Sequence, residues 1–261
     1  GGRSALDYLI KVKGYSFLEA VETIIGHTAI QAPVYEKPHP KEENKPLLLP
    51  EKCASNRVIT EYLFGRGIDF EIINYCISND LIFESLPYHN VVFVGYDEKK
   101  EPKYAAYRST NKRRIMGDCS GSKKDYSFRL GKENLEEVHL FECAIDLLSY
   151  ATLAKMNGQD WKEMSFVSLS GVYSPAKKIE DSKVPIALEK YLGSNPSVRK
   201  IRIHFDNDIA GRKAAQTLKT ILPDKYEIVD EPPKAGKDFN DFLCMRMGIY
   251  NKKTHERNEE R

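Results

Sequence analysis

From Leu135 onward the sequence alternates between short apolar runs typical of strands and longer runs with helical periodicity. The four expected strands are VHLFE, SFVSLSG, KIRIHFD and KYEIV, and a helical pattern follows each of them. This alternation predicts an α/β fold: a mainly parallel sheet flanked by helices. Ligands of such sheets bind beyond the carboxyl ends of the strands, so the residues after each strand are the first candidates for a site.

Acidic residues follow two of these strands. Glu142 ends the first strand, and Asp146 lies one helical turn later on the same face. Asp206 ends the third strand, and Asp208 precedes Gly211, which lets the next helix approach closely. If the two strands are neighbours, these carboxylates meet at one edge of the sheet, where Mg²⁺ or Mn²⁺ would suit an all-oxygen ligand set. Each acid taken alone could equally be a helix cap, but clustered carboxylates repel one another without a cation.

The two segments FECAIDLLS and HFDNDIAGRKAA together resemble the toprim domain of DnaG-type primases, type IA and II topoisomerases and small nucleases. That family has a Glu after one strand and Asp-x-Asp after another, which match Glu142, Asp206 and Asp208. In the primase branch of the family the first motif is often EGxxD, and in this sequence Cys143 replaces the glycine while Asp146 is kept. The resemblance, which covers about residues 135–248, implies three catalytic acids and a metal site formed by these acids and Asp146.

Two further segments extend the resemblance. Gly171 follows the second strand, where toprim domains carry a glycine turn near the site. The segment GKDFND resembles the KDxN motif of phage and mobile-element primases and matches Lys237, Asp238 and Asn240. It implies nucleotide binding by Lys237, with Asp238, Asn240, Gly171 and Gly211 in supporting positions. By itself the segment also fits an ordinary helix cap at Asp238.

A basic stretch precedes the toprim-like part. Residues 99–132 hold eleven basic and three acidic side chains, a local net charge of +8 in a chain whose total is +2. Tyrosine and phenylalanine are interleaved with the bases, a mixture typical of surfaces that bind single-stranded nucleic acid, although a solvated charged face is the alternative. The stretch resembles the basic region of DnaG-type primases. The candidate nucleic-acid or nucleotide ligands are Lys103, Arg108, Arg113, Arg114, Lys123 and Lys124.

The remaining patterns divide the chain further. Two helices capped by Ser55 and Asp69 and a hairpin of residues 91–97 and 103–109 predict a smaller α+β domain before the toprim domain. The first helical patterns resemble the segment after the zinc ribbon of DnaG-type primases. No ribbon cysteines precede Gly1, so we expect a fragment that lacks its N-terminal zinc ribbon. The expected segments are a helical hairpin at 1–26, a proline-rich linker at 27–50, the basic α+β domain at 51–134, the toprim domain at 135–249 and a charged tail at 250–261.

Cysteine spacing and hydropathy limit the class of protein. The 5 cysteines are widely spaced without a CxxC pair, which indicates neither a disulfide framework nor a zinc site. The mean hydropathy is -0.51, and no run approaches the roughly 18 apolar residues of a membrane span. The first residues do not have the pattern of a signal peptide. We therefore expect a cytoplasmic protein without a membrane partner.

Three functions fit these patterns. The first is a primase-like nucleotidyltransferase that acts with divalent metal ions on single-stranded DNA and nucleoside triphosphates, in replication or mobile-element transfer, with a helicase or relaxase as candidate partner. The second is a metal-dependent toprim nuclease. The third is a non-catalytic nucleic-acid-binding module, because a fold alone does not fix an activity. A topoisomerase is disfavoured because the length scarcely accommodates its strand-passage domains.

Overall fold

The computed structural model describes residues 5–15, 19–20, 23–24, 45–171, 173–176 and 178–249. It divides the chain into two units, Gly1–Asn44 and Lys45–Arg261. In the first unit the helix α1 spans Ala5–Lys11. Most of the predicted linker and all of the predicted tail lie outside the described residues.

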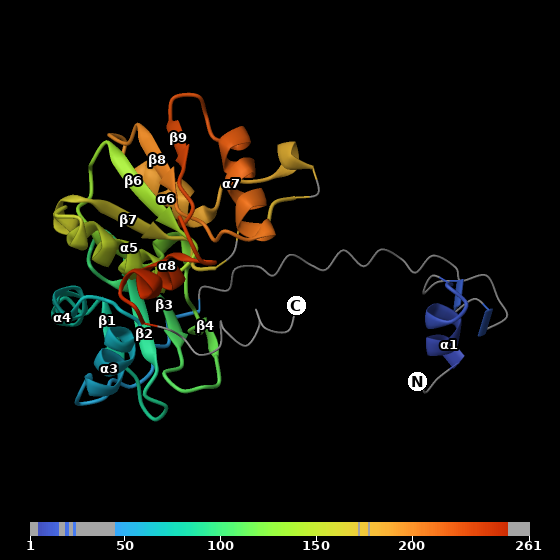
Figure 1. Cartoon of the computed structure of the whole chain (residues 1–261), viewed down its shortest axis with the longest axis horizontal. Helices are drawn as coiled ribbons and strands as arrows, with labels where there is room; N and C mark the ends of the chain where they lie inside the picture. Colours follow the sequence, from blue (N-terminus) through green and yellow to red (C-terminus); the bar gives the residue numbers. More distant parts are fainter. Residues whose placement is uncertain are drawn as a thin grey trace. The chain divides into compact units, whose positions relative to one another are not determined.

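The second unit begins with two helices and an antiparallel sheet (Figure 1). The predicted helices and hairpin are present, and two three-residue strands at the sheet edges were not predicted. The sheet order is β1-β2-β3-β4, with a register shift at Gly95 in the central pair. The elements are α3 (Arg57–Gly65), α4 (Phe70–Ser78), β1 (Ile82–Glu84), β2 (Val91–Tyr96), β3 (Pro102–Arg108) and β4 (Met116–Asp118).

The two predicted helix caps had different outcomes. Asp69 caps α4 by accepting a hydrogen bond from the backbone N–H of Glu71, as predicted. Ser55 is not the N-cap residue itself, because Asn56 takes that position, but the Ser55 hydroxyl accepts a hydrogen bond from the N–H of Arg57, the first residue of α3, at 3.2 Å. The buried carboxylate of Glu84, remote in sequence, accepts from the next two N–H groups, those of Val58 and Ile59. A long-range contact therefore completes the local cap.

The rest of the unit confirms the α/β prediction. Its five-stranded sheet has the order β5-β7-β6-β8-β9, in which β5 is antiparallel and the other four strands are parallel. Because β6 lies between β7 and β8, the two strands that precede the acidic motifs are neighbours. The strands are β5 (Arg129–Gly131), β6 (Glu137–Phe141), β7 (Ser165–Ser168), β8 (Lys200–Ile203) and β9 (Glu227–Asp230).

Helices cover both faces of this sheet (Figure 1). Alternation along β6 sends Phe141 to the core shared with α5 and α8, and Val138 and Leu140 to the core shared with α6 and α7. No helix in the described ranges is long and apolar enough to cross a membrane. The helices are α5 (Ala144–Met156), α6 (Ile186–Ser194), α7 (Ile209–Ile221) and α8 (Phe239–Arg246).

One apolar core joins the two sheets. Ile72 of α4 and Phe93 of β2 belong to the same buried cluster as Phe141 of β6, Leu148 of α5 and Leu243 of α8. Such shared burial stabilises both parts together, at roughly 25 cal/mol for each Å² of apolar surface removed from water. The antiparallel sheet is therefore held in a fixed position beside the acidic strand ends.

Candidate functional site

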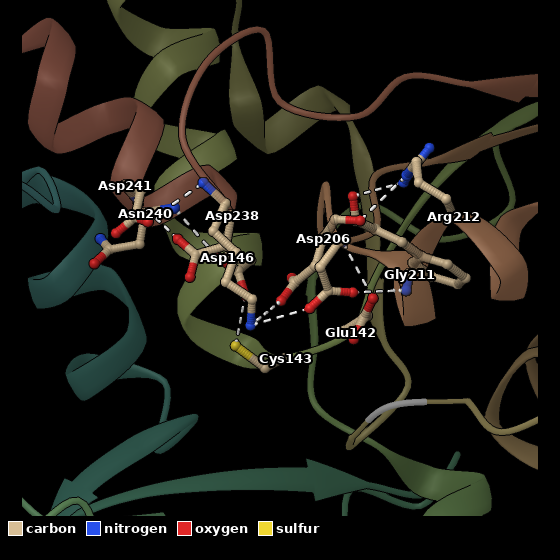
Figure 2. Close-up of polar contacts among 12 residues, drawn as sticks. Glu142, Cys143, Asp146, Asp206, Gly211, Arg212, Asp238, Asn240 and Asp241 are labelled. Atoms are coloured by element: carbon tan, nitrogen blue, oxygen red, sulfur yellow. Dashed lines mark hydrogen bonds and ion pairs between the residues drawn. The ribbon is translucent and has the colours of Figure 1, made fainter. Parts of the chain in front are cut away.

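Three of the four predicted acids, Glu142, Asp206 and Asp208, follow the carboxyl ends of β6 and β8, and Figure 2 shows Glu142 beside Asp206. Glu142 follows β6 and is 5% exposed, and its Oε1 accepts a hydrogen bond from the backbone N–H of Asp206, at 3.1 Å. Asp208 caps α7 by accepting from the N–H of Gly211, at 2.9 Å. The cap interpretation of Asp208 is correct, and it leaves the second carboxylate oxygen for the site.

Two glycines allow this close packing. At Gly211 a Cβ atom would overlap the carbonyl oxygen of Asp206 and lie 2.9 Å from Oε1 of Glu142. Gly171 has a φ of +126°, which favours glycine, and its N–H donates to the carbonyl oxygen of Glu142, at 2.9 Å. Both predicted glycines thus position the backbone around the same carboxylate.

Arg212 fixes the loop between β8 and α7. Its guanidinium donates to the carbonyl oxygens of Phe205 and Asp206, at 2.8 and 3.2 Å, and forms an ion pair with Asp230, at 2.7 Å. A planar fork with several donors suits this geometry, which a lysine could not reproduce. The sequence prediction did not include Arg212. Its only signal was a basic residue directly after Gly211.

Lys237 forms ion pairs with two of the acids. Its Nζ is 3.1 Å from Oδ2 of Asp206 and 3.3 Å from Oδ2 of Asp208. In the part of the chain that the structure describes, no three of the predicted acids bring one oxygen each within 4.8 Å of one another. The Lys237 ammonium group supplies the positive charge that balances Asp206 and Asp208. Because its side chain is 57% exposed, it can leave at little cost.

Asp146 faces the first turn of α8 instead of making a hydrogen bond to the other acids. Its Oδ1 accepts from the N–H of Asn240, at 3.2 Å, and its Oδ2 accepts from the thiol of Cys143, at 2.8 Å. The Asn240 side chain in turn donates to Ser149 of α5. Asp238 caps α8 through the N–H of Asp241. The predicted supporting residues thus join α5 to α8, and the structure assigns Asp146 to this junction.

Burial and mutual repulsion perturb the ionisation of the acids. Burial, with the charge of Asp206, raises the pKa of Glu142 to about 7. Burial also raises the pKa of Asp206, although Lys237 opposes the shift. The N–H of Gly211 holds the pKa of Asp208 below its usual value. The bond to Asp206 raises the pKa of Lys237, so the ammonium stays charged at neutral pH.

The donor set fits a divalent cation. Glu142, Asp206 and Asp208 offer only carboxylate oxygens, the ligands that Mg²⁺ and Mn²⁺ prefer over imidazole or thiolate. Two of these carboxylates already hold a cationic group, the Lys237 ammonium. Burial, together with repulsion from Asp206, keeps the Glu142 carboxyl partly protonated near neutral pH, and an added positive charge favours its ionised form. These three residues could hold such an ion once Lys237 withdraws.

A cleft of about 310 Å³ reaches Cys143, the residue after Glu142, although Glu142, Asp206 and Asp208 do not line it. Its lining includes Arg108 of β3 and Lys124 on one side and Gly171 with the start of α5 on the other. Arg108 donates to the hydroxyl of Tyr62, at 3.1 Å, and Lys124 pairs with Asp118, at 3.2 Å. Two of the predicted basic residues therefore line a cleft that also includes Cys143 and Gly171, the two residues directly linked to Glu142 through the backbone.

The other predicted basic residues are distributed around the sheet. Lys103 is held by Glu101 and Asp97, at 2.6 and 3.4 Å, so the structure does not place it in the cleft. Arg113 and Arg114 are exposed in the loop between β3 and β4. Lys123 is exposed beside η1, a 3-10 turn at Lys124–Tyr126. The positions of the charges could be predicted from the sequence but their partners could not, because ion pairs such as those of Lys103 depend on the hairpin register.

Comparison with solved structures aligns the chain with three primases at low identity. For the primase fragment of the bacteriophage T7 primase-helicase protein the identity is 18%, the TM-score 0.47 and the coverage 71% of this chain and 69% of that chain. For the E. coli primase catalytic core the identity is 12% and the TM-score 0.47, and the alignment covers 78% of this chain and 72% of that chain. For the zinc-binding and RNA polymerase domains of Aquifex aeolicus primase the identity is 15% and the TM-score 0.45, and the alignment covers 95% of this chain and 68% of that chain.

Family models match two successive parts of the chain. Residues 61–134 match the family described as "Protein of unknown function (DUF3991)". Residues 139–243 match the family described as "Toprim-like". No curated protein sequence matches the chain. The toprim resemblance of the acidic motifs is therefore confirmed, and the chain is a toprim-domain protein in which a Toprim-like domain follows a smaller domain of the DUF3991 family.

Proposed function

We propose that this protein is a primase-like nucleotidyltransferase that extends a strand on single-stranded DNA from nucleoside triphosphates. The observation that carries the proposal is the adjacency of two features. Three carboxylates, Glu142, Asp206 and Asp208, follow neighbouring parallel strands, and a cleft lined by Arg108 and Lys124 reaches Cys143, the residue after Glu142. Nucleotidyl transfer needs both a cation site for a triphosphate and a surface for a polyanionic template.

The acidic side would bind the reacting phosphates. Glu142, Asp206 and Asp208 would hold Mg²⁺ or Mn²⁺, which when bound neutralises phosphate charge and lowers the pKa of an attacking hydroxyl. Lys237 is tied to Asp206 and Asp208 and is half-exposed, so its ammonium can turn from the acids to a triphosphate. It would then act as a point charge on phosphate oxygens. Arg212 and Gly211 keep the acids in position.

The basic side would hold the template. Arg108 is fixed by Tyr62 within the cleft, and its guanidinium can bind phosphate in a defined orientation. Tyr107 also lines the cleft, which adds an aromatic ring on which a base can stack. Arg113 and Arg114 extend the positive surface beyond the cleft. Stacking with phosphate contacts is the combination expected for single-stranded DNA.

A paired assay tests the proposal. Single-stranded DNA with a labelled end is incubated with Mg²⁺ or Mn²⁺, with and without labelled nucleoside triphosphates. We expect labelled products only with triphosphates and template, and at least a 100-fold loss in Asp206→Asn, because removing a metal ligand removes several kcal/mol of charge stabilisation. Asp224→Asn, a substitution in an exposed loop, is the matched control. Shortening of the DNA without triphosphates would contradict synthesis and indicate a nuclease instead. Binding of DNA without turnover would contradict both activities.

A further inference from the structure

A second group of metal-ligating side chains lies away from the acidic site. Cys53, Glu84 and His89 each offer one ligand atom, and these atoms all lie within 4.8 Å of one another. Nδ1 of His89 is 2.5 Å from Oε1 of Glu84. The three residues come from a segment before α3, the end of β1 and the turn after β1. Spacing along the sequence does not reveal such a group, which is why the cysteine pattern indicated no zinc site.

Backbone contacts hold these three residues in place. The N–H of Cys53 donates to the carbonyl oxygen of Glu84, at 2.8 Å, beside an isolated bridge between Lys52 and Ser85. The N–H of His89 donates to the carbonyl oxygen of Ser85, also at 2.8 Å. The fold therefore assembles the group before any ligand binds. A preorganised site avoids most of the entropy cost of gathering its ligands.

The Glu84 carboxylate is oriented as metal-binding carboxylates are. It is 2% exposed, and its Oε2 accepts from the N–H groups of Val58 and Ile59, at 2.8 and 3.2 Å. This leaves Oε1 directed toward His89. A buried carboxylate needs a compensating positive charge, and hydrogen bonds to its other oxygen fix the direction of the free one.

We propose that Cys53, Glu84 and His89 form a binding site for a divalent cation of the Zn²⁺ class. Thiolate, imidazole and carboxylate are the donors that Zn²⁺ accepts in proteins, whereas Mg²⁺ prefers oxygen alone. Zn–S bonds of about 2.3 Å and Zn–N or Zn–O bonds of about 2.0 Å place ligand atoms roughly 3–4 Å apart. The hydrogen-bonded His89 and Glu84 atoms, at 2.5 Å, must therefore separate by about 1 Å, and the Cys53 thiol, within 4.8 Å of both, must approach by at most about 1 Å. Three protein ligands leave a fourth position for water or another donor.

The site would stabilise the basic part of the molecule. The hydroxyl of Thr110 donates to the carbonyl oxygen of His89, at 3.0 Å, and Thr110 begins the loop that carries Arg113 and Arg114. A cation at His89 would therefore join the segment around Cys53, the end of β1 and this loop. Its role is structural and does not depend on the activity proposed above.

Cobalt spectroscopy tests the proposal on the whole chain. The reduced protein is saturated with Mg²⁺ to occupy the acidic site and is then titrated with Co²⁺, whose bond to a thiolate gives a near-ultraviolet charge-transfer band. We expect the band in the wild type and in Cys143→Ser, the control for the thiol beside the acidic site, and its loss in Cys53→Ser. His89→Gln, with a 45% exposed side chain, should weaken Co²⁺ binding by at least about tenfold. A wild type without the band, or a band that depends on Cys143, would overturn the proposal.

Thiol alkylation gives a second readout that needs no substitution at the buried Glu84. Iodoacetamide modification of each cysteine is followed by mass spectrometry, with Cys119, also partly exposed, as the internal control. We expect Zn²⁺ at about 100 times its Kd to slow modification of Cys53 roughly 100-fold, because only the unbound thiol reacts. Modification of Cys53 at the same rate with and without Zn²⁺ would overturn the metal site. A rapid, zinc-independent reaction that requires His89 would instead indicate a thiol–imidazole pair.

Discussion

Replacing Gly211 by alanine tests the packing on which the acidic site depends. The added Cβ would overlap the carbonyl oxygen of Asp206 and approach Oε1 of Glu142 to 2.9 Å. The first of these atoms belongs to the backbone, so α7 or the loop after β8 must move. Overpacking of this kind costs about 1–3 kcal/mol, and the rigid obstacle places Gly211→Ala near the upper value.

Helix propensity acts in the opposite direction. Alanine is more favourable than glycine inside a helix by about 1 kcal/mol, so the expected net loss in the free energy of unfolding is about 2 kcal/mol. Gly193 in α6 supplies the control, because nothing lies within 4 Å of the position of its Cβ. Gly193→Ala should therefore raise the free energy of unfolding by about 0.5–1 kcal/mol.

Urea unfolding measures both effects. Trp161 is the single tryptophan, is 2% exposed and belongs to the core that α5 and α8 share, so its fluorescence reports on the relevant unit. Circular dichroism on the same samples checks that one transition is followed. We also expect weaker Mn²⁺ binding in Gly211→Ala alone, because the shift separates Asp206 from Glu142. Equal stabilisation by the two substitutions would refute the close-packing argument.

Four further predictions concern charge. Burial raises the pKa of Glu142 from 4.5 to about 7, so without metal the free energy of unfolding should fall as pH rises between these values, and calorimetric Mn²⁺ affinity should rise with pH up to about 7. Glu142→Gln should weaken both trends without abolishing them, because burial also raises the pKa of Asp146 and of Asp206; unchanged trends would assign them to those other groups. Lys237→Met should tighten Mn²⁺ binding roughly 2- to 30-fold, the value of two exposed ion pairs, while it lowers turnover; weaker binding would contradict the bridging role. Arg212→Lys should lower the free energy of unfolding in urea by about 1–3 kcal/mol, since lysine cannot keep the fork of hydrogen bonds, and a change below about 0.5 kcal/mol would contradict this. Removing the charges of Arg113 and Arg114 should reduce the slope of log affinity for single-stranded DNA against log salt by about 1.4, and an unchanged slope would exclude them from the interface.

The α/β part of the fold could be predicted because its strands and helices differ in period and succeed one another regularly. The order of the strands could not be predicted: the sequence analysis made the meeting of the acids conditional on β6 and β8 being neighbours, which the structure shows them to be. The three-residue strands β1, β4 and β5 could not be predicted, because so short a segment shows no periodicity. The start of α3 was predicted only in part, because Ser55 bonds one amide of its first turn, whereas Glu84, far along the chain, bonds the next two.

The identity of the site residues could be read from the sequence, but their contacts could not. Asp206 and Asp208 were recognised from their spacing, whereas the ion pairs with Lys237 depend on how the loop after β9 returns to the sheet. The bond between Arg108 and Tyr62 joins residues 46 positions apart and left no local signal. Long-range contacts therefore account for most of what the sequence analysis missed.

The central claim is that Glu142, Asp206 and Asp208 form one site for a divalent cation. Mn²⁺ binding followed by electron paramagnetic resonance, with Mg²⁺ as competitor, tests this claim without requiring turnover. We predict Mg²⁺-displaceable Mn²⁺ in the wild type and in Asp224→Asn, and at least a tenfold weaker affinity in Asp206→Asn, because a hard cation loses one of its three carboxylate ligands. Equal Mn²⁺ affinity in Asp206→Asn and the wild type would contradict the claim.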